Sequence, residues 1–347
     1  MMVAEARVRD VGTGTRLGFF GSMTLLAREM RSVLESRAFP AADVRLFDAA
    51  AEGTLSEFGG EALVVTRPDE DAIPGLDIAF LCGTAAEMAP YLDWPARWGF
   101  TAIDLSGAAF DRGAPLVHAG INPADIASGG VPVPLIAAPH AVAHNLVTLA
   151  AAARGAASVA SIDAVAFRPV SEMGEKGIEE LQGQTVGLLN FTEVPNEVLG
   201  RQVAFNLVPS PGVPSSRAEG FEERIQREVS VLAGLETNRV SLASAIAPLF
   251  HGHAMHVALR FGQPVTREGL SAAFEQSREV RLVTDPEAFS PVDLAGEETL
   301  AIGFLQVDET SRRAGFWSFC DNLRGGALLN AVRLAERLAD LRMETSS

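Results

Sequence analysis

Short apolar runs alternate with segments of helical spacing over the first 105 residues. Residues 25–36 place their apolar side chains at intervals of three and four, which predicts a helix, and residues 84–98 follow a similar pattern. Around them stand apolar runs that predict buried strands, at residues 17–21, 44–48, 62–65, 77–82 and 100–105. Strands that alternate with helices favour a parallel, doubly wound, Rossmann-like sheet.

The pattern changes beyond residue 140. Residues 144–154 and the amphipathic residues 325–343 predict helices. Residues 158–169, 243–250 and 256–261 alternate or run apolar, as in an antiparallel sheet with one covered face, and the proline- and serine-rich residues 206–216 predict a loop. We therefore expect an α/β protein that consists of a Rossmann-like domain and a second, α+β domain.

Composition and charge narrow the classes of partner. The 347 residues carry a formal net charge of −16, and no apolar run reaches the ~18 residues that span a bilayer. An acidic surface repels nucleic acid and anionic lipid, so we expect neither a nucleic acid nor a membrane as a partner. The two cysteines, Cys82 and Cys320, argue against a disulfide framework and favour a cytoplasmic location. Residues 1–16 are expected to form a flexible N-terminus.

A series of short motifs stands in a fixed order along the chain. The most specific motif reads Asp-Asn-Leu-Arg-Gly-Gly-Ala-Leu-Leu-Asn-Ala at residues 321–331. Others lie at residues 35–40, 77–80, 104–106, 115–117, 121–123, 177–181, 204–209 and 252–253. Over residues 17–341 the series resembles the aspartate-semialdehyde dehydrogenase family, and the chain is identified as a divergent, USG-like member that lacks the family's cysteine.

The resemblance implies a domain organisation and an activity. Residues 17–139 would form a Rossmann-like, NAD(P)-binding-type domain and residues 140–316 a catalytic-like dimerisation domain. A C-terminal helix within residues 317–347 would pack back on the first domain, and the chain would form a homodimer. The family reduces an acyl phosphate to an aldehyde with NADPH, through a thioester on its cysteine.

The chain departs from the family at the positions that carry this chemistry. The nucleophile position is Ala141, and a methyl side chain cannot attack a carbonyl. The family's glutamine falls on Arg168, and its substrate-binding arginine falls on Ile246. Only the base position keeps its residue, His253. These changes predict that the chain does not catalyse the family reaction.

The phosphate site of the family is altered as well. Its arginine falls on Asp111 or is shifted to Arg112. Residues 171–176 replace a glycine-rich turn of the family and add the carboxylates of Glu172 and Glu175. Carboxylates near an anion site repel a phosphorylated substrate.

The nucleotide loop keeps only part of its glycine pattern. Gly21 stands at the first position, but Thr24 and Ala27 stand at the second and third, and a β-branched Thr24 disfavours a positive φ. Asp48 ends the second predicted strand, where a carboxylate accepts from a ribose 2′-hydroxyl and favours NAD over NADP. We assign no cofactor. A weakened NAD(P) site would comprise Gly21, Ser22, Thr24, Asp48, Cys82, Gly83, Asn322 and Asn330.

Five of the six histidines flank the altered site in sequence. His140 and His144 are spaced to share a helix face, and His251 and His253 are spaced to share a strand face. We expect His140 and His253 to face each other, where an imidazole pair could bind Zn²⁺. The alternative, which we prefer, is that they are ordinary polar residues of a leftover pocket, so no metal site is assigned.

Two further groups of residues admit a chemical and a structural interpretation. Cys82 follows a predicted strand at the edge where ligands bind such sheets, so it is a candidate nucleophile; the alternative is buried packing, which we also expect for Cys320. The charged run that includes Glu222, Arg224 and Glu228 lies where the family keeps substrate-binding charges, but we interpret it as a solvated helix face.

Three functions follow, in order of preference. The first is a dimeric homologue that lacks the family activity and acts as a binding or regulatory protein, with an unknown small-molecule ligand or protein partner. The second is an oxidoreductase that uses NAD(P) with altered chemistry, or a metal-assisted enzyme that uses His140 and His253. The third is an active semialdehyde dehydrogenase whose nucleophile is Cys82.

Overall fold

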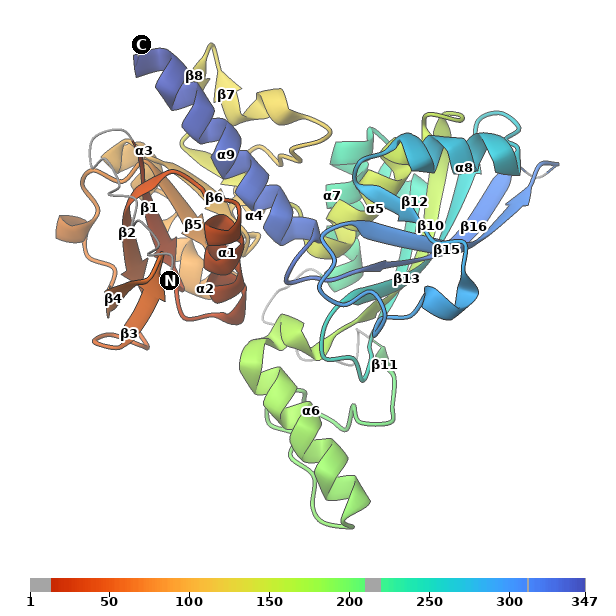
Figure 1. The fold of residues 1–347 in the computed structure, drawn as a ribbon, viewed down its shortest axis with the longest axis horizontal. Helices are drawn as coiled ribbons and strands as arrows, with labels where there is room; N and C mark the ends of the chain where they lie inside the picture. Colours follow the sequence, from red (N-terminus) through yellow and green to blue (C-terminus); the bar gives the residue numbers. More distant parts are fainter. Residues whose placement is uncertain (1–13, 210–219, 311, 347) are drawn as a thin grey trace, which may run out of the picture. The chain divides into compact units, whose positions relative to one another are not determined.

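The computed structural model of the protein describes residues 14–209, 220–310 and 312–346, and these form two compact units (Figure 1). Unit 1 contains the described residues up to Pro115, together with Ala124–Ala137 and the segment from Val332 onward. Unit 2 contains Leu116–Pro123 and Ala138–Ala331. The main division thus falls after Ala137, but each unit takes a short segment from elsewhere in the chain.

Unit 1 is built on a seven-stranded sheet in the order β3-β4-β2-β1-β5-β6-β9. All of its pairs are parallel except β3 with β4. The strands are β1 (Thr15–Phe20), β2 (Ala41–Phe47), β3 (Leu55–Phe58), β4 (Glu61–Thr66), β5 (Ile78–Leu81), β6 (Thr101–Asp104) and β9 (Leu135–Ala137). Every residue of β5 and β6 is buried, which explains why these strands have continuous apolar runs. The predicted Rossmann-like sheet is confirmed.

The helices of unit 1 confirm one sequence prediction and correct another. Helix α1 (Leu25–Ser36) has the predicted bounds. The single helix predicted over residues 84–98 is wrong, because this segment forms α2 (Ala85–Met88), the 3-10 turn η2 (Ala89–Tyr91) and α3 (Trp94–Trp98). A proline lies in the first turn of both η2 and α3, where its missing N–H prevents a continuous ladder of hydrogen bonds. The remaining elements are η1 (Glu70–Ala72), α4 (Ala108–Asp111), η3 (Pro123–Ile126), β7 (Ala127–Ser128) and β8 (Val131–Pro132).

Unit 2 is built on a second seven-stranded sheet, in the order β11-β12-β10-β13-β16-β15-β14. Its strands are β10 (Val159–Arg168), β11 (Val208–Pro209), β12 (Val240–Ile246), β13 (His253–Phe261), β14 (Val280–Leu282), β15 (Leu300–Asp308) and β16 (Arg313–Cys320). The expected antiparallel sheet is wrong for two pairs, because β10 with β12 and β14 with β15 are parallel. The strand expected over residues 243–250 ends earlier, at Ile246.

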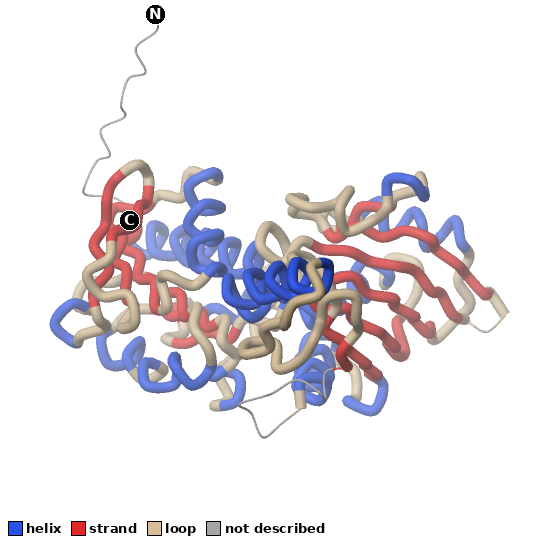
Figure 2. The backbone as a smooth tube through the Cα atoms, turned by 90° about the horizontal axis from the view of Figure 1, so that it is seen from below, coloured by secondary structure: helices blue, strands red, loops and turns tan. Residues whose placement is uncertain are grey.

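The helices of unit 2 cover one face of this sheet. Helices α5 (Ala141–Ala153), α7 (Phe221–Ala233) and α8 (Arg267–Gln276) contact β10, β12 and β15 respectively, and Figure 2 shows the strands (red) as a layer beside helices (blue). On the opposite face Val165 and Trp317 are 40% and 39% exposed. Helix α6 (Gly174–Leu189) projects from this unit in Figure 1. Short turns η4 (Val170–Met173), η6 (Thr237–Arg239) and η7 (Pro286–Ala288) complete it.

Helix α9 (Gly326–Ser346) begins in unit 2 and belongs to unit 1 from Val332 onward. Glu336 accepts hydrogen bonds from Arg37 at 2.8 and 3.0 Å, and Arg342 donates to Asp77. The predicted C-terminal helix and its packing against the first domain are thus seen in unit 1. No helix in the described part of the chain is long and apolar enough to cross a membrane.

The predicted flexible N-terminus and the predicted loop over residues 206–216 lie partly outside the described residues. Residues 1–13 of the expected flexible N-terminus are not described, whereas Thr15 and Arg16 belong to β1 and correct that prediction. In the expected loop over residues 206–216, Val208 and Pro209 form β11, and residues 210–216 lie outside the described ranges.

Candidate functional site

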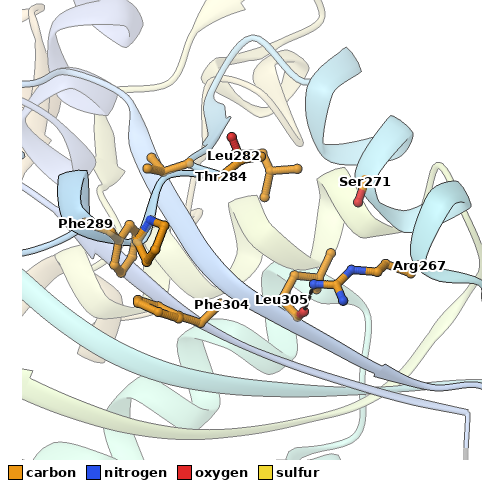
Figure 3. A pocket seen from close by; sticks show the side chains of 9 residues that line it. Arg267, Ser271, Leu282, Thr284, Phe289, Phe304 and Leu305 are labelled. Atoms are coloured by element: carbon orange, nitrogen blue, oxygen red, sulfur yellow. Dashed lines mark hydrogen bonds between the residues drawn. The ribbon is translucent and has the colours of Figure 1, made fainter.

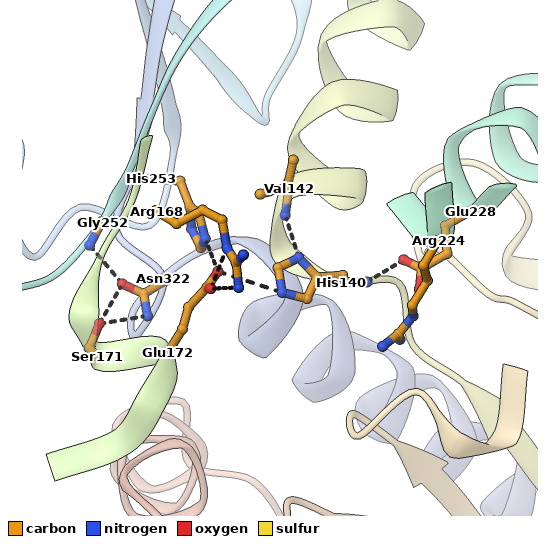
Figure 4. A network of polar contacts seen from close by, with 10 residues as sticks. All are labelled: His140, Val142, Arg168, Ser171, Glu172, Arg224, Glu228, Gly252, His253 and Asn322. Carbon is orange, nitrogen blue, oxygen red and sulfur yellow. Dashed lines mark hydrogen bonds and ion pairs between the residues drawn. The ribbon is translucent and has the colours of Figure 1, made fainter. Parts of the chain in front are cut away.

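The altered nucleophile position lies at the start of a helix. Ala141 is the first residue of α5, and His140 is its N-cap, with Nδ1 accepting a hydrogen bond from the Val142 N–H at 3.2 Å (Figure 4). The helix was predicted to begin at His144, so its start is corrected. The backbone N–H of His144 donates to the His140 carbonyl at 2.8 Å, as the i, i+4 spacing implies, and the His144 ring stacks on the His118 ring, 4.4 Å between centroids.

Glu172 is the centre of the polar network at this helix start (Figure 4). Its Oε2 accepts hydrogen bonds from Nε and Nη2 of Arg168, at 2.7 and 2.5 Å. Its Oε1 lies 2.5 Å from Nε2 of His253 and 3.6 Å from Nε2 of His140. The expectation that His140 and His253 face each other is confirmed, since their ring centroids are 6.1 Å apart, but a carboxylate stands between them.

The electrostatics of this group fix its charges. Burial raises the pKa of the Glu172 carboxyl, but Arg168, His253 and His140 outweigh it, so the net pKa lies well below its usual range. Burial lowers the pKa of His140 to about 3, although Glu172 acts in the opposite direction. Glu172 is therefore an anion and His140 a neutral imidazole at neutral pH. Because Nδ1 of His140 accepts from Val142, its proton is assigned to Nε2, which faces Glu172.

Arg168 is positioned by an aromatic ring as well as by Glu172. It is the last residue of β10, and its guanidinium carbon lies 3.5 Å from the centroid of the Phe221 ring at the start of α7. Arginine binds both carboxylates and aromatic faces well because its charge is spread over a planar group. The His140 ring meets the same phenyl ring edge-on at 5.1 Å.

His253 is held by the turn that precedes β13. Gly252 has φ +82°, and a Cβ there would lie 2.2 Å from Cζ of Phe319, so only glycine fits. His253 is 1% exposed, and among the described residues its Nδ1 has no hydrogen-bond partner. His251 precedes the strand and is exposed, so the predicted strand face shared by His251 and His253 is wrong.

The charged run on α7 is partly buried, which corrects its interpretation as a solvated face. Arg224 and Glu228 are 9% and 0% exposed, and Arg224 Nε donates to Glu228 Oε1 at 2.8 Å. Glu228 Oε2 accepts from the backbone N–H of His140 at 2.7 Å. The pair therefore holds the start of α5 in place, whereas Glu222 and Glu223 at the helix start are more exposed.

Ile246, Asn322 and Asn330, which were predicted at the substrate and cofactor sites, pack against or hydrogen-bond to neighbouring parts of unit 2. Ile246 is 1% exposed within an apolar cluster that includes Val170 and Val208. Asn322 Oδ1 accepts from the Gly252 N–H at 2.7 Å, and its amide donates to Ser171 at 3.2 Å. Asn330 accepts from the Ala119 N–H and donates to the Val117 carbonyl, at 2.8 and 3.1 Å, and so fixes that segment within unit 2.

A thiol lies near the altered nucleophile position. A Cβ built on Gly326 would lie 3.6 Å from the Cys320 sulfur and 3.8 Å from the Ala141 methyl carbon, so both groups border the same point. Burial, followed by the neighbouring Asp321, raises the pKa of Cys320 to about 12. Burial likewise raises the pKa of Cys82 to about 12. Both thiols are protonated at neutral pH, which does not support the Cys82 nucleophile.

Local hydrogen bonds fix the conformation of the nucleotide-type loop of unit 1. Thr24 is the N-cap of α1 with φ −63°, so the expected conflict with a positive φ is wrong. Its hydroxyl accepts from the Ala27 N–H at 3.3 Å and donates to the Gly21 carbonyl at 2.8 Å. Gly21 has φ +67°, and a Cβ there would lie 2.9 Å from the Gly83 nitrogen. Asp48 accepts from the Met23 and Ala50 N–H groups, at 3.2 and 3.0 Å.

The remaining predicted positions lie in unit 1. Ser22 is 0% exposed and its carbonyl accepts from Arg31 at 2.6 Å. Asp111 is the last residue of α4, and Arg112 caps this helix and lies 3.3 Å from Asp93. The exposed ion pair gives Arg112 a partner on the surface.

A cavity of about 380 Å³ lies in unit 2 beside α8 and β15 (Figure 3). Its one charged side chain, Arg267, donates to the Leu305 carbonyl at 2.6 Å. The lining is Arg267, Ser271, Leu282, Val283, Thr284, Pro286, Phe289, Phe304 and Leu305, and it includes none of the predicted site residues. We therefore place the candidate site at Glu172 and not in this cavity.

Within residues 14–209, 220–310 and 312–346 no three His, Cys, Asp or Glu side chains are grouped so that they could hold a metal ion. The sequence prediction missed that Glu172 is the centre of the site, although the added carboxylate itself was noticed. It also missed the link from Glu228 to His140, which no local pattern signals.

Comparison with known proteins assigns both halves of the chain to one family. The semialdehyde dehydrogenase NAD binding domain matches residues 16–129, and the semialdehyde dehydrogenase dimerisation domain matches residues 149–325. The chain therefore belongs to the semialdehyde dehydrogenase family. Within it, the protein is a homologue of the aspartate-semialdehyde dehydrogenases, as the resemblance predicted.

Individual relatives agree over nearly the whole chain. A USG-1 protein homolog of Pseudomonas aeruginosa is 28% identical over 322 residues, 92% of this chain and 96% of the relative. Aspartate-semialdehyde dehydrogenase of Streptomyces akiyoshiensis is 28% identical over 344 residues, 93% of this chain and 98% of the relative. The structure of aspartate semialdehyde dehydrogenase II of Vibrio cholerae, complexed with ASA, has a TM-score of 0.87 at 25% identity and covers 94% of this chain and 98% of that chain.

Proposed function

We propose that this protein does not catalyse the reduction of an acyl phosphate and acts as a dimeric binding or regulatory homologue of the aspartate-semialdehyde dehydrogenases. The observation that carries the proposal is Ala141 at the start of α5. The resemblance puts the nucleophilic cysteine at this position, where a helix N-terminus would favour a thiolate. A methyl group offers neither a nucleophile nor a proton.

The surroundings of Ala141 support the same conclusion. His253 keeps the base position, but its Nε2 is engaged by Glu172 at 2.5 Å. Ile246 replaces an anion clamp with an apolar side chain that is packed in the core. Cys320 lies nearby, but burial keeps its thiol protonated. The groups that remain are thus bound to each other and not arranged around an open reaction centre.

We also propose that the second copy binds on the open face of the unit 2 sheet. Val165, His256 and Trp317 are register partners in one row across β10, β13 and β16. Val165 and Trp317 stay substantially exposed, and the His256 and Trp317 rings are 5.6 Å apart. A row with an exposed valine and an exposed tryptophan, on a face that the helices leave uncovered, is typical of an interface between copies. Residues 149–325 match a dimerisation domain, which supports this assignment.

The test is an assay of the purified protein in both directions of the family reaction, with NADP⁺ and NADPH and with NAD⁺ and NADH. We expect no turnover above a mock preparation. Turnover that survives purification and is abolished by His253→Ala would overturn the proposal. We rank the metal-assisted alternative lower, because the Glu172 carboxylate between His140 and His253 is bound by Arg168. A cytoplasmic location stays a prediction from the two buried thiols.

A further inference from the structure

Three side chains from separate elements converge on one carboxylate. Arg168 comes from the end of β10, His253 from the start of β13, and His140 from the N-cap of α5. Arg168 places two N–H groups on one oxygen of Glu172, at 2.7 and 2.5 Å. The imidazoles of His253 and His140 approach the other oxygen, at 2.5 and 3.6 Å. Donors therefore surround both oxygens of a planar two-oxygen anion, and hydrogen bonds from a charged donor to a carboxylate are among the strong ones.

The positive charge in this group requires an anion. The Arg168 guanidinium carries a positive charge, and its side chain is 12% exposed. A nearly buried cation with no anion beside it is strongly unfavourable. In this structure Glu172 supplies that anion, so a carboxylate of the protein itself balances the charge of Arg168.

The anion is supplied by a flexible side chain on a short turn. Glu172 belongs to the four-residue η4, whose first residues are fixed by their backbone: Val170 and Ser171 donate to the carbonyls of Leu249 and Phe250, at 2.9 and 3.1 Å. Rotation about the side-chain bonds of Glu172 would therefore move its carboxylate out of the site without unfolding the turn. Glu172 is 11% and His140 25% exposed, so the group borders solvent.

We propose that Arg168, His253 and His140 form a binding site for a small carboxylate, and that Glu172 is an internal ligand that a carboxylate-bearing small molecule displaces. The inference rests on the proposed binding role and gives it a ligand class. Glu172 competes with the external ligand, so it lowers the apparent affinity of the wild-type protein. A carboxylate is favoured over phosphate because the donors surround two oxygens and not three or four.

The experiment removes the internal ligand and supplies an external one. Glu172→Ala leaves space for formate or acetate, and thermal unfolding and calorimetric titration of the full chain are followed in sodium acetate, formate, phosphate and chloride at equal ionic strength. We expect Glu172→Ala to be less stable than the wild type in chloride and to be stabilised by acetate or formate. Its affinity for acetate should exceed that of the wild type by at least tenfold. Glu175→Ala, which removes an exposed carboxylate three residues away, is the matched control and should not be stabilised by acetate or formate.

A double variant tests whether Arg168 binds the carboxylate. Arg168→Gln with Glu172→Ala removes the cation and restores the residue that the family resemblance puts at position 168, so acetate should no longer stabilise the protein. If Glu172→Ala folds only when acetate is present, that dependence is itself the expected result.

Three results would overturn the proposal: no effect of carboxylates on Glu172→Ala, an equal effect on the double variant, or stabilisation by phosphate alone. Each is separable from the proposed loss of activity. An active wild-type protein would not contradict the proposed carboxylate site. An absence of stabilisation by carboxylates would not contradict the proposed loss of the family reaction.

Discussion

Arg168 and Ile246 are register partners on the parallel strands β10 and β12. The resemblance puts the family's substrate-binding arginine at position 246 and a glutamine at position 168. A guanidinium is therefore missing from one strand and present on the next, at the same level of the sheet. Because Glu172 binds it, this cation is neutralised within the protein.

Replacing Ala141 by cysteine should restore a thiol and not the reaction. We expect Ala141→Cys to be alkylated by iodoacetamide faster than the wild type, because its two native thiols are buried with a pKa of about 12. Acyl-phosphate reduction should stay at the level of a mock preparation, since Glu172 engages both Arg168 and His253.

The control for Ala141→Cys must exclude a disulfide between the new thiol and Cys320. Cys320 and Ala141 border the same point, so the assay needs a reductant, and Ala141→Cys should be compared with a form that also carries Cys320→Ser. Turnover restored by Ala141→Cys alone would show that the rest of the catalytic site is intact.

His140 should make the stability of the protein depend on pH between 7 and 5. Its pKa is about 3 in the folded state and about 6.5 in the unfolded state, so the unfolded state binds more protons in this range. Stability is therefore full above about pH 6.5 and falls as the pH decreases towards 3, by at most about 1.4 kcal/mol per pH unit. The carboxyl of Glu172, whose folded-state pKa is also depressed, adds its own loss only below about pH 4.3.

The comparison is with His140→Asn, which keeps a good N-cap without a titrating ring. Between pH 7 and 5 the wild type should lose about 2 kcal/mol of unfolding free energy relative to the variant, measured by urea denaturation. Parallel curves for the two proteins would contradict the depressed pKa of His140.

The open face of the unit 2 sheet should control the oligomeric state. Trp317→Glu puts a charge in the row that includes Val165 and His256, so we expect it to convert a dimer into a species with the mass of one chain, 36.7 kDa. Light scattering at micromolar concentration measures this mass. Val64→Glu, an exposed apolar position in unit 1, should leave the dimer unchanged. A wild-type mass of one chain would refute the interface.

The loop of unit 1 should discriminate between the two nicotinamide cofactors. The Asp48 carboxylate is held close to Met23 at the end of β2, where it would repel a 2′-phosphate and accept from a 2′-hydroxyl. Calorimetric titration should give tighter binding of NAD⁺ than of NADP⁺, by roughly tenfold, and Asp48→Ala should reduce the difference. Tighter binding of NADP⁺, or no binding of either at millimolar concentration, would rule out this site.

Gly252 should be the most sensitive glycine near the site. In Gly252→Ala the new methyl group would meet Phe319 at 2.2 Å in a backbone with positive φ, so we expect a loss of about 3 kcal/mol or more. Gly234→Ala has the same kind of backbone with no atom within 4 Å, and it should cost only about 1 kcal/mol. Chemical denaturation of both variants separates steric overlap from backbone strain, and equal losses would show that Phe319 moves away.

The sequence predicted what depends on local pattern and on an ordered series of motifs. The parallel sheet of unit 1, helices α1 and α9, the altered position 141 and the facing pair of His140 and His253 all follow from such signals. The partners of Glu172 and Glu228 do not, because each carboxylate binds groups from other elements of unit 2. A charged run such as that of α7 has the same appearance in a sequence whether water or the start of another helix lies against it.

The route of α9 has a consequence for how the chain acquires its structure during synthesis. Unit 1 contains the first described strand and also residues 332–346, whose Leu334, Ala335 and Leu338 are buried. These residues follow all of unit 2 in the chain, so the first domain to emerge from the ribosome is completed only after the second has been synthesised. The surface of the nascent N-terminal sheet that α9 covers therefore stays exposed until residues 332–346 have been synthesised.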